Sequence, residues 1–416
     1  MILTKLNLLF FYIAVILTLT GCGSQALVES TSYKEEYIPE EDYNYRSYFW
    51  FEGSQGMVQT EDGFYFIVGN YMFFMDKTTG QSVPLCFKTD CLHNEETDQS
   101  KTAYCDAYMG SGSSFLGYSH DKLYTVCVDR NTAKTNMIEM NMDGSDRKIL
   151  YPYSSDDGTS SPIILMHRGV IYFPSTMKDL EGKSYYGLNA FSTVSGSREP
   201  VQVYTGEYEN GWIQNVIAFH NYIFFKDCYY TDISYEGKMM MYDIQTGECE
   251  EILEEDCTIY GIEDSNLLIY MHNDRKYCVY SPTQKELMPS QINYDVFLDA
   301  HPLWNCNCEN QDEDIAMFTC YDREVNDFIP DLYVVNAQGE VIAVVPDAAW
   351  STMGNYVFDD GGDIYYFRYS KTLSPFWIRG YSKSDLLQGI VNPITVIEVE
   401  DYNDAFNKPC EIYTGN

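Results

Sequence analysis

An aromatic, strand-like run returns about every 50 residues along this 416-residue chain, and this repeat limits the folds open to it. Each run follows a cluster of Gly, Asn, Asp or His that is typical of a tight turn. A partner strand follows, and the stretch 140–150 (MNMDGSDRKIL) shows a second polar turn leading into another strand. One residue marks each repeat: Tyr65, Tyr124, Tyr172, Phe224, Ile269, Phe318 and Tyr365.

A four-stranded antiparallel sheet in every repeat of about 40–50 residues is typical of a β-propeller blade. One sheet cannot bury both of its faces alone, whereas sheets packed radially around an axis bury both. We therefore predict an all-β β-propeller of seven blades over 47–416, with six or eight blades as the alternatives. The 140–150 turn would join the outer strands of its blade, and the segment near 48–51 would add a strand to the last blade.

The N-terminus has the features of an export signal. Lys5 is the only charged residue before an apolar run from Leu6 to Leu19, which is too short to cross a bilayer comfortably. The run leads into Thr20-Gly21-Cys22, which resembles the lipobox of bacterial lipoproteins. The resemblance implies a signal peptide over 1–21 and a lipidated Cys22 that anchors the protein to the cell membrane, facing the extracytoplasmic side. Residues 22–46 are polar and acidic, and we predict a flexible tether.

The chain is strongly acidic, with 26 Lys and Arg against 62 Asp and Glu and a formal net charge of −36. Such a surface repels phosphate backbones, which argues against a nucleic-acid partner. The acidic runs Asp312–Asp314 and Asp359–Asp363 carry carboxylates of the kind that bind calcium, but neither has the spacing of an EF-hand loop. We predict solvated turns at both runs, with calcium as the less favoured alternative.

Cysteine is the most informative residue type for chemistry. Within an insertion at 84–108, Cys86, Cys91, His93 and Cys105 supply three thiolates and one imidazole, which is a complete ligand set for tetrahedral zinc. Disulfides are expected outside the cytoplasm, although three cysteines cannot all pair among themselves. We expect a disulfide-stapled loop, with structural zinc and free thiols as the alternatives. Further along, we place Cys306 and Cys308 in a predicted loop.

Two segments carry a family resemblance. The run Asp143–Leu150 (DGSDRKIL) resembles the blade turn of LDL-receptor-like and TolB-like propellers. The insertion 84–108 is similar to a segment of uncharacterised surface lipoproteins of Gram-positive anaerobes that carry a DUF5050-type domain. The resemblance implies a propeller fold and a surface location, and it brings no catalytic residues with it.

Seven further residues are candidates for facing a ligand. The histidines precede the marker residue of the second, third and fourth repeats by four or five positions: His120, His167 and His220. We favour a structural role in turns for them over a shared metal site. The tryptophans lie in or near predicted connecting segments: Trp212, Trp304, Trp350 and Trp377. We favour packing against a neighbouring blade over ligand stacking for each of them.

The sequence contains no nucleophile elbow, P-loop or dinucleotide-binding fingerprint. We therefore expect a binding or scaffold protein rather than an enzyme, with a surface glycan, a peptide or a protein as its ligand. Beyond zinc or calcium we expect no cofactor, and the membrane is the other expected partner, through the lipid anchor. The alternative function is a propeller-type polysaccharide lyase or glycosidase that acts at the channel mouth.

Overall fold

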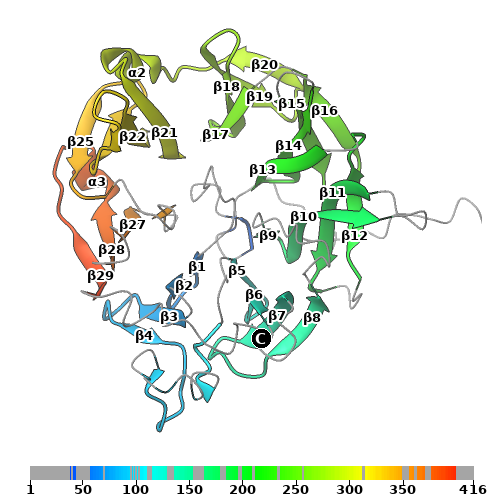
Figure 1. The fold of residues 1–416 in the computed structure, drawn as a ribbon, viewed down its shortest axis with the longest axis vertical. Helices are drawn as coiled ribbons and strands as arrows, with labels where there is room; N and C mark the ends of the chain where they lie inside the picture. The colour runs from blue at the N-terminus through cyan, green and yellow to red at the C-terminus, as the bar shows by residue number, and fades with distance from the viewer. Residues whose placement is uncertain are drawn as a thin grey trace, which may run out of the picture.

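The described strands form seven antiparallel sheets arranged in a ring, as seen in the computed structural model in Figure 1. Within each sheet, the four main strands follow one another in chain order from the centre to the rim. The described residues are 38, 41–43, 57–68, 71–93, 96, 98, 101, 104–109, 115–128, 135–152, 164–178, 184–194, 199–208, 211–231, 235–254, 257–311, 314–348, 356–359, 363–370 and 376–399. The predicted all-β β-propeller fold is confirmed.

The N-terminal part of the described chain forms the first four sheets. The first sheet contains β1 (Met57–Gln59), β2 (Gly63–Val68), β3 (Tyr71–Asp76) and β4 (Ser82–Pro84). The second contains β5 (Leu116–Ser119), β6 (Lys122–Val128), β7 (Thr135–Asn141) and β8 (Lys148–Pro152). The third contains β9 (Leu165–His167), β10 (Val170–Lys178), β11 (Ser184–Ser192) and β12 (Val201–Thr205). The fourth contains β13 (Gly211–Phe219), β14 (Tyr222–Tyr230), β15 (Tyr235–Asp243) and β16 (Cys249–Leu253).

The remaining three sheets complete the ring. The fifth contains β17 (Cys257–Glu263), β18 (Asn266–Met271), β19 (Lys276–Ser281) and β20 (Glu286–Pro289). The sixth contains β21 (Trp304–Gln311), β22 (Ile315–Asp322), β24 (Leu332–Asn336) and β25 (Val341–Val345), with β23 (Asp327–Phe328) paired to β22. The seventh contains β26 (Tyr356–Asp359), β27 (Ile364–Ser370), β28 (Phe376–Ser382) and β29 (Ile394–Val399). Two short helices, α2 (Asp295–Ala300) and α3 (Lys383–Leu386), lie in connections.

The seven marker residues of the repeat all lie on the second strand of a sheet, and none is more than 7% exposed. Their strands are buried on both faces: β22 begins with six consecutive buried residues, and β14 has six in a row. The fourth strands lie at the rim and keep solvent contact, as β8 and β16 show. A continuous apolar run therefore predicts a strand that is sandwiched between neighbouring sheets.

Apolar clusters join each sheet to the next. Phe66 of the first sheet shares one cluster with Leu123 of the second. The same cluster contains Ile378 of β28, so the last sheet packs against the first. Equivalent clusters connect the intervening neighbours. The ring is therefore held by packing between sheets, since each described sheet consists only of strands that are close in sequence.

The turn in 140–150 joins β7 to β8, the two outer strands of the second sheet, as predicted. Asp143 Oδ1 accepts a hydrogen bond from the backbone N of Ser145 at 3.0 Å. Gly144 has a φ of 79°, a conformation in which a side chain would be strained. The Asp-Gly-Ser sequence is thus explained by the geometry of the turn.

A segment ahead of the first sheet is packed onto the third. Asp42 and Arg168 form an ion pair whose Oδ1–Nε distance is 2.6 Å, and both side chains are almost fully buried. The backbone N of Arg168 donates to Glu41 O at 2.6 Å, and the backbone N of Tyr43 donates to His167 Nδ1 at 3.0 Å. Tyr43 itself is only 2% exposed. The end of the predicted tether, 22–46, is therefore part of the packed body at these residues.

Several sequence predictions lie outside the described residues. They are the signal peptide 1–21, the lipidated Cys22 and the extra strand near 48–51. Among the residues that the structure does describe, no helix is long and apolar enough to span a membrane.

Replacing Asp42 with Asn should lower the free energy of unfolding by roughly 3 kcal/mol, because it removes the carboxylate charge that pairs with the buried Arg168 guanidinium. The same change should make the chain ahead of Tyr43 more sensitive to protease. Urea denaturation and limited proteolysis measure the two effects. Asp274→Asn is the control, since its pair with Lys276 is exposed and should contribute less than about 1 kcal/mol. Equal effects of the two substitutions would contradict this role for Asp42.

Candidate functional site

The insertion between β4 and β5 projects from the ring beside the first sheet (Figure 1) and is fastened to the first two sheets. The backbone N of Met72 on β3 donates to Ala107 O at 2.8 Å, and the backbone N of Leu85 donates to Met72 O at 2.9 Å. From the turn between β7 and β8, Arg147 Nη1 donates to Tyr108 O at 2.9 Å. The 140–150 turn of the second sheet thus helps to hold the insertion of the first.

This fastening brings together the four metal-ligating candidates of the insertion. Three Sγ atoms and one ring nitrogen lie within 4.8 Å of one another, from Cys86, Cys91, His93 and Cys105. The Sγ of Cys105 is 3.7 Å from the Nδ1 of His93. The three cysteines are free thiols, so the disulfide-stapled loop that we expected is not formed in this structure.

Two of the three sulfur atoms accept a hydrogen bond from a backbone N–H. The N–H of His93 donates to Cys91 Sγ at 3.3 Å, and the N–H of Asp106 donates to Cys86 Sγ at 3.4 Å. The bond from His93 favours the thiolate form of Cys91, whereas burial opposes ionisation and raises the pKa of Cys91 and Cys105. A cation beside these two sulfur atoms would favour their ionisation.

Among the described residues, no group of possible metal ligands includes the three candidate histidines. His167 is fully buried, its Nε2 donates to His220 O at 2.7 Å, and its Nδ1 accepts from Tyr43. Burial lowers its pKa to about 4, so it is neutral at pH 7. His120 and His220 have φ values of 50° and 49° in the loops that join first and second strands. Histidine is among the residues enriched in this conformation, which explains both positions as turn residues.

Two of the four candidate tryptophans have described side chains. Trp304 is half-buried and stacks on His301, with ring centroids 3.8 Å apart. Trp212 is half-buried and lies 4.7 Å from the ring of Tyr230. Trp377 belongs to β28, where its side chain is not described, and Trp350 lies outside the described residues. Trp212 and Trp304 thus contact neighbouring aromatic rings.

The acidic runs are only partly described, and their described members bind protein groups. Asp363 accepts hydrogen bonds from Ser382 and Ser384, which lower its pKa. Asp314 forms an ion pair with Lys383 at 2.6 Å. These two carboxylates therefore connect the residues around α3.

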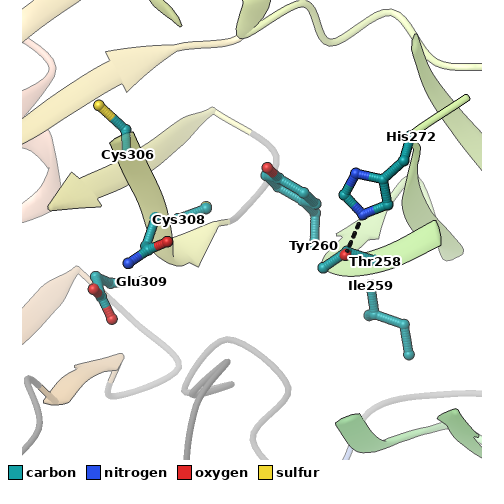
Figure 2. Close-up of a pocket in the computed structure, with 8 residues that line it drawn as sticks. Thr258, Ile259, Tyr260, His272, Cys306, Cys308 and Glu309 are labelled. Carbon is teal, nitrogen blue, oxygen red and sulfur yellow. Dashed lines mark hydrogen bonds between the residues drawn. The ribbon is translucent and has the colours of Figure 1, made fainter. Parts of the chain in front are cut away.

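A cavity of about 150 Å³ lies between β17 and β21, the innermost strands of the fifth and sixth sheets (Figures 1 and 2). Figure 2 shows Tyr260 and His272 on one side and Cys308 and Glu309 on the other. The Oγ1 of Thr258 is hydrogen bonded to His272 Nε2 at 2.8 Å. The cavity thus combines an aromatic ring, an imidazole and a carboxyl group.

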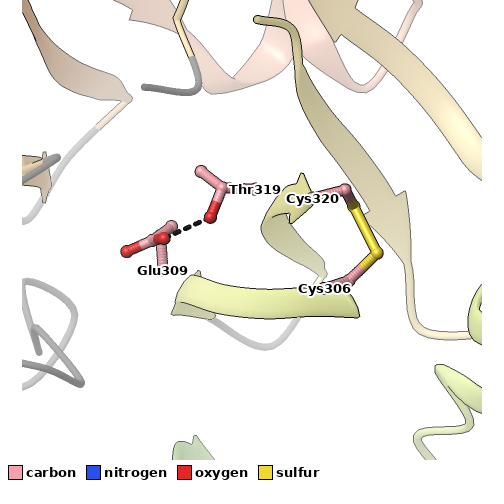
Figure 3. The surroundings of a disulfide bond; sticks show 4 residues. All are labelled: Cys306, Glu309, Thr319 and Cys320. Atoms are coloured by element: carbon pink, nitrogen blue, oxygen red, sulfur yellow. Dashed lines mark hydrogen bonds between the residues drawn. A yellow bond between two sulfur atoms is a disulfide. The ribbon is translucent and has the colours of Figure 1, made fainter. Parts of the chain in front are cut away.

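Glu309 is the carboxylic acid of this cavity, and its pKa is raised. Its residue surface is partly exposed, but its carboxyl group is surrounded by protein atoms, and this burial raises its pKa to about 7. Thr319 donates its hydroxyl hydrogen to the carboxylate and partly offsets the shift (Figure 3). Among the described residues, no Lys, Arg or His forms an ion pair with Glu309. A carboxyl group of this kind in a cavity is a candidate for function.

A disulfide fixes the strand that carries Glu309. Cys306 and Cys320 are opposite each other on β21 and β22 and are bonded (Figure 3). Our placement of Cys306 and Cys308 in a loop is therefore wrong, because both lie on β21. The polar Asn-Cys-Asn-Cys-Glu-Asn sequence did not look like a strand, but as the innermost strand it keeps one side toward the centre of the ring.

Bulges in the inner strands place the cavity residues. The register shifts between Ile259 and Gly261 on β17, which leaves Tyr260 as the extra residue. It shifts again between Cys308 and Asn310 on β21, which leaves Glu309 as the extra residue. A bulge re-aims a side chain and is frequent beside functional sites. The sequence analysis missed these residues, and the only signal in the sequence was a lone Glu within a polar, Asn-rich strand.

No protein-family model and no curated protein matches the chain. Solved structures do match, and those named here each have a TM-score below 0.5. The acylaminoacyl peptidase of Pyrococcus horikoshii has a TM-score of 0.49 and 9% identity, covering 87% of this chain and 54% of the peptidase. A prolyl endopeptidase has a TM-score of 0.48 and 8% identity, covering 86% and 52%. The chain therefore spans about half the length of these two enzymes.

A third solved structure is a propeller alone. The β-propeller domain of the Trilobed protease of Pyrococcus furiosus has a TM-score of 0.46 and 10% identity, covering 84% of this chain and 96% of that domain. We draw no functional conclusion from likeness at this level. The resemblance to DUF5050-type lipoproteins stays a prediction from the sequence.

The raised pKa of Glu309 predicts a pH-dependent stability that Glu309→Gln should remove. The folded chain holds this proton up to about pH 7, whereas the unfolded chain releases it near the ordinary glutamate value of 4.5, so the free energy of unfolding falls as the pH rises between these values. Urea denaturation at pH 5 and pH 8 should show the variant gaining roughly 1–2 kcal/mol over wild type at pH 8 only. Glu324→Gln, in an exposed turn, should show no such gain. A gain of the same size at both pH values would contradict the assignment.

Proposed function

We propose that this protein is an extracytoplasmic β-propeller that binds a peptide, protein or glycan by inserting one basic group of the ligand between β17 and β21. The observation that carries the proposal is the Glu309 carboxyl group, which has a raised pKa and no cationic partner among the described residues. An ammonium or guanidinium group beside it would favour ionisation and gain a charge-assisted hydrogen bond. The aromatic ring of Tyr260 lines the same cavity and offers a face for the cation.

The size of the cavity supports recognition of part of a ligand. About 150 Å³ is the liquid volume of roughly five water molecules, and whole small ligands need about 300 Å³ or more. One side chain or one sugar substituent fits this space. The net charge of −36 further favours a basic ligand over an acidic one.

Binding is favoured over hydrolysis by the number of carboxyl groups. Glycoside hydrolysis of the common kind needs two carboxyl groups across the scissile bond. Among the described residues that line the cavity, Glu309 is the only carboxylic acid. The lyase or glycosidase alternative therefore has no second acid at this site within the described chain.

The proposal includes attachment to the cell membrane through a lipid on Cys22. Sixteen positions separate Cys22 from Ile38, where the described chain begins, so at most about 55 Å of extended chain connects them. Because Asp42 and Tyr43 are packed on the third sheet, the propeller would be held close to the membrane with a preferred orientation. We also propose that each of the seven sheets is one blade, which agrees with the period of the sequence.

Matched ligands test the basic-group proposal. An array of peptides with Lys or acetyl-Lys, and of amino sugars with free or acetylated amines, should give binding only to the members with a free amine. Glu309→Gln should weaken that binding at least tenfold, and wild-type binding should tighten between pH 6 and pH 8 as Glu309 ionises. Glu324→Gln serves as the control. Equal binding of free and acetylated amines would refute the proposal, and release of products would favour the enzyme.

Mass spectrometry of the N-terminal peptide tests the anchor. The wild-type protein should sediment with membranes and carry acyl chains on Cys22, since two or three chains give stable attachment. Cys22→Ala should lose both the acyl chains and the mature N-terminus. An unmodified Cys22 in membrane-bound wild-type protein would contradict this part of the proposal.

A further inference from the structure

We propose that Cys86, Cys91, His93 and Cys105 bind one zinc ion, which fixes the 84–108 insertion to the first two sheets. This site lies in the insertion beside the first sheet, whereas the Glu309 cavity lies between the fifth and sixth sheets. The inference is independent of the proposed ligand. Its failure would leave the Glu309 cavity untouched.

Distances between the ligand atoms support a tetrahedral ion. Zinc binds sulfur at about 2.3 Å and nitrogen at about 2.0–2.1 Å, so the ligand atoms of a tetrahedral site lie roughly 3.5–3.8 Å apart. The Sγ of Cys105 and the Nδ1 of His93 are 3.7 Å apart. All four atoms lie within 4.8 Å of one another, and small side-chain movements would close the remaining gap. Contact between Cys105 and a ring nitrogen is not explained by pairing among the cysteines.

Hydrogen bonds to the sulfur atoms support the same ion. Cys91 accepts the backbone N–H of His93, the residue two positions later. Cys86 accepts the N–H of Asp106, which is next to Cys105 in the chain. Two of the three sulfur atoms thus have a donor that stabilises negative charge, as thiolate ligands require. His93 has a φ of 53°, a left-handed conformation that is uncommon for residues other than glycine.

The ligand types select the metal and its role. Thiolates with an imidazole suit zinc, whereas calcium and magnesium prefer oxygen ligands. Four protein ligands complete a tetrahedral shell and leave no open position for a substrate, which is typical of a structural site. Three thiolates and one Zn²⁺ together carry a single negative charge. Lys88, two positions after Cys86, forms an ion pair with Asp106 in which Nζ is 2.7 Å from Oδ1.

Elemental analysis of the full chain, purified without chelators, should give one zinc per chain. A chelator should remove it and expose three additional reactive thiols. Replacing zinc with Co²⁺ should give the absorption bands of a tetrahedral site with thiolate ligands. One iron or copper per chain, or no metal in protein that was never treated with chelator or oxidant, would overturn the assignment to zinc.

Trypsin offers a direct test against disulfides. Cleavage after Lys77, Lys88, Lys101 and Lys122 places the three cysteines in separate peptides, 78–88, 89–101 and 102–122. Alkylation in denaturant with chelator should label all three peptides as single chains. Any two of them joined by a disulfide in freshly isolated protein would refute the zinc site.

Variants complete the experiment. Cys91→Ser should lower the zinc content at least tenfold, whereas Cys249→Ser, outside the cluster, should keep one zinc. His93→Cys preserves four ligands and should retain the metal, which guards against a Cys91 variant that merely fails to fold. A Cys91→Ser variant that keeps one zinc per chain would contradict the proposal.

Discussion

The burial of the middle strands of the described sheets on both faces is the constraint on which this structure depends. Six consecutive residues, most of them apolar, are buried on β14 and on β22, so neither face of these strands is open to water. A sheet of this kind is stable only between two others, and a ring is the arrangement in which no sheet lacks a neighbour. The cluster that joins Ile378 to Phe66 closes this ring by side-chain packing between the last and first sheets.

This constraint also decides where polar chemistry is possible. Unpaired polar groups are costly to bury on the second and third strands, and the two candidate sites lie on inner strands and in an insertion at the rim. Glu309 lies on an inner strand, at a bulge that releases it from the regular pairing. The cysteine cluster lies outside the sheets altogether. Buried charged groups have partners: Arg168 balances Asp42, and the hydroxyls of Tyr186 and Tyr204 donate to Asp227 on β14.

The sequence predicted the propeller well because the burial pattern repeats with the sheets. Marker residues such as Tyr172 and Phe318 lie on equivalent strands, and local periodicity is enough to find them. The Cys86–Cys105 cluster was also recognisable, because its ligands are close in sequence. Glu309 and Tyr260 were not, since their proximity depends on the packing of two sheets and on bulges that shift the register. The sequence analysis also missed the contact of Tyr43 with His167, because 124 positions separate these residues in the chain.

The insertion shows why a metal would matter in this fold. Its surface exposes Phe87, Leu92 and Tyr104, which are 75%, 55% and 49% accessible, so these residues contribute little apolar burial. Its described residues form no strand beyond the single bridge from Tyr71 to Tyr108. Ordering such a segment costs roughly 1–2 kcal/mol for each residue, and burial at its ends, as at Leu85 and Tyr108, together with its backbone hydrogen bonds, supplies free energy against that cost. The zinc ion proposed for the four ligand atoms would add to this, because coordination of a structural zinc contributes free energy of folding.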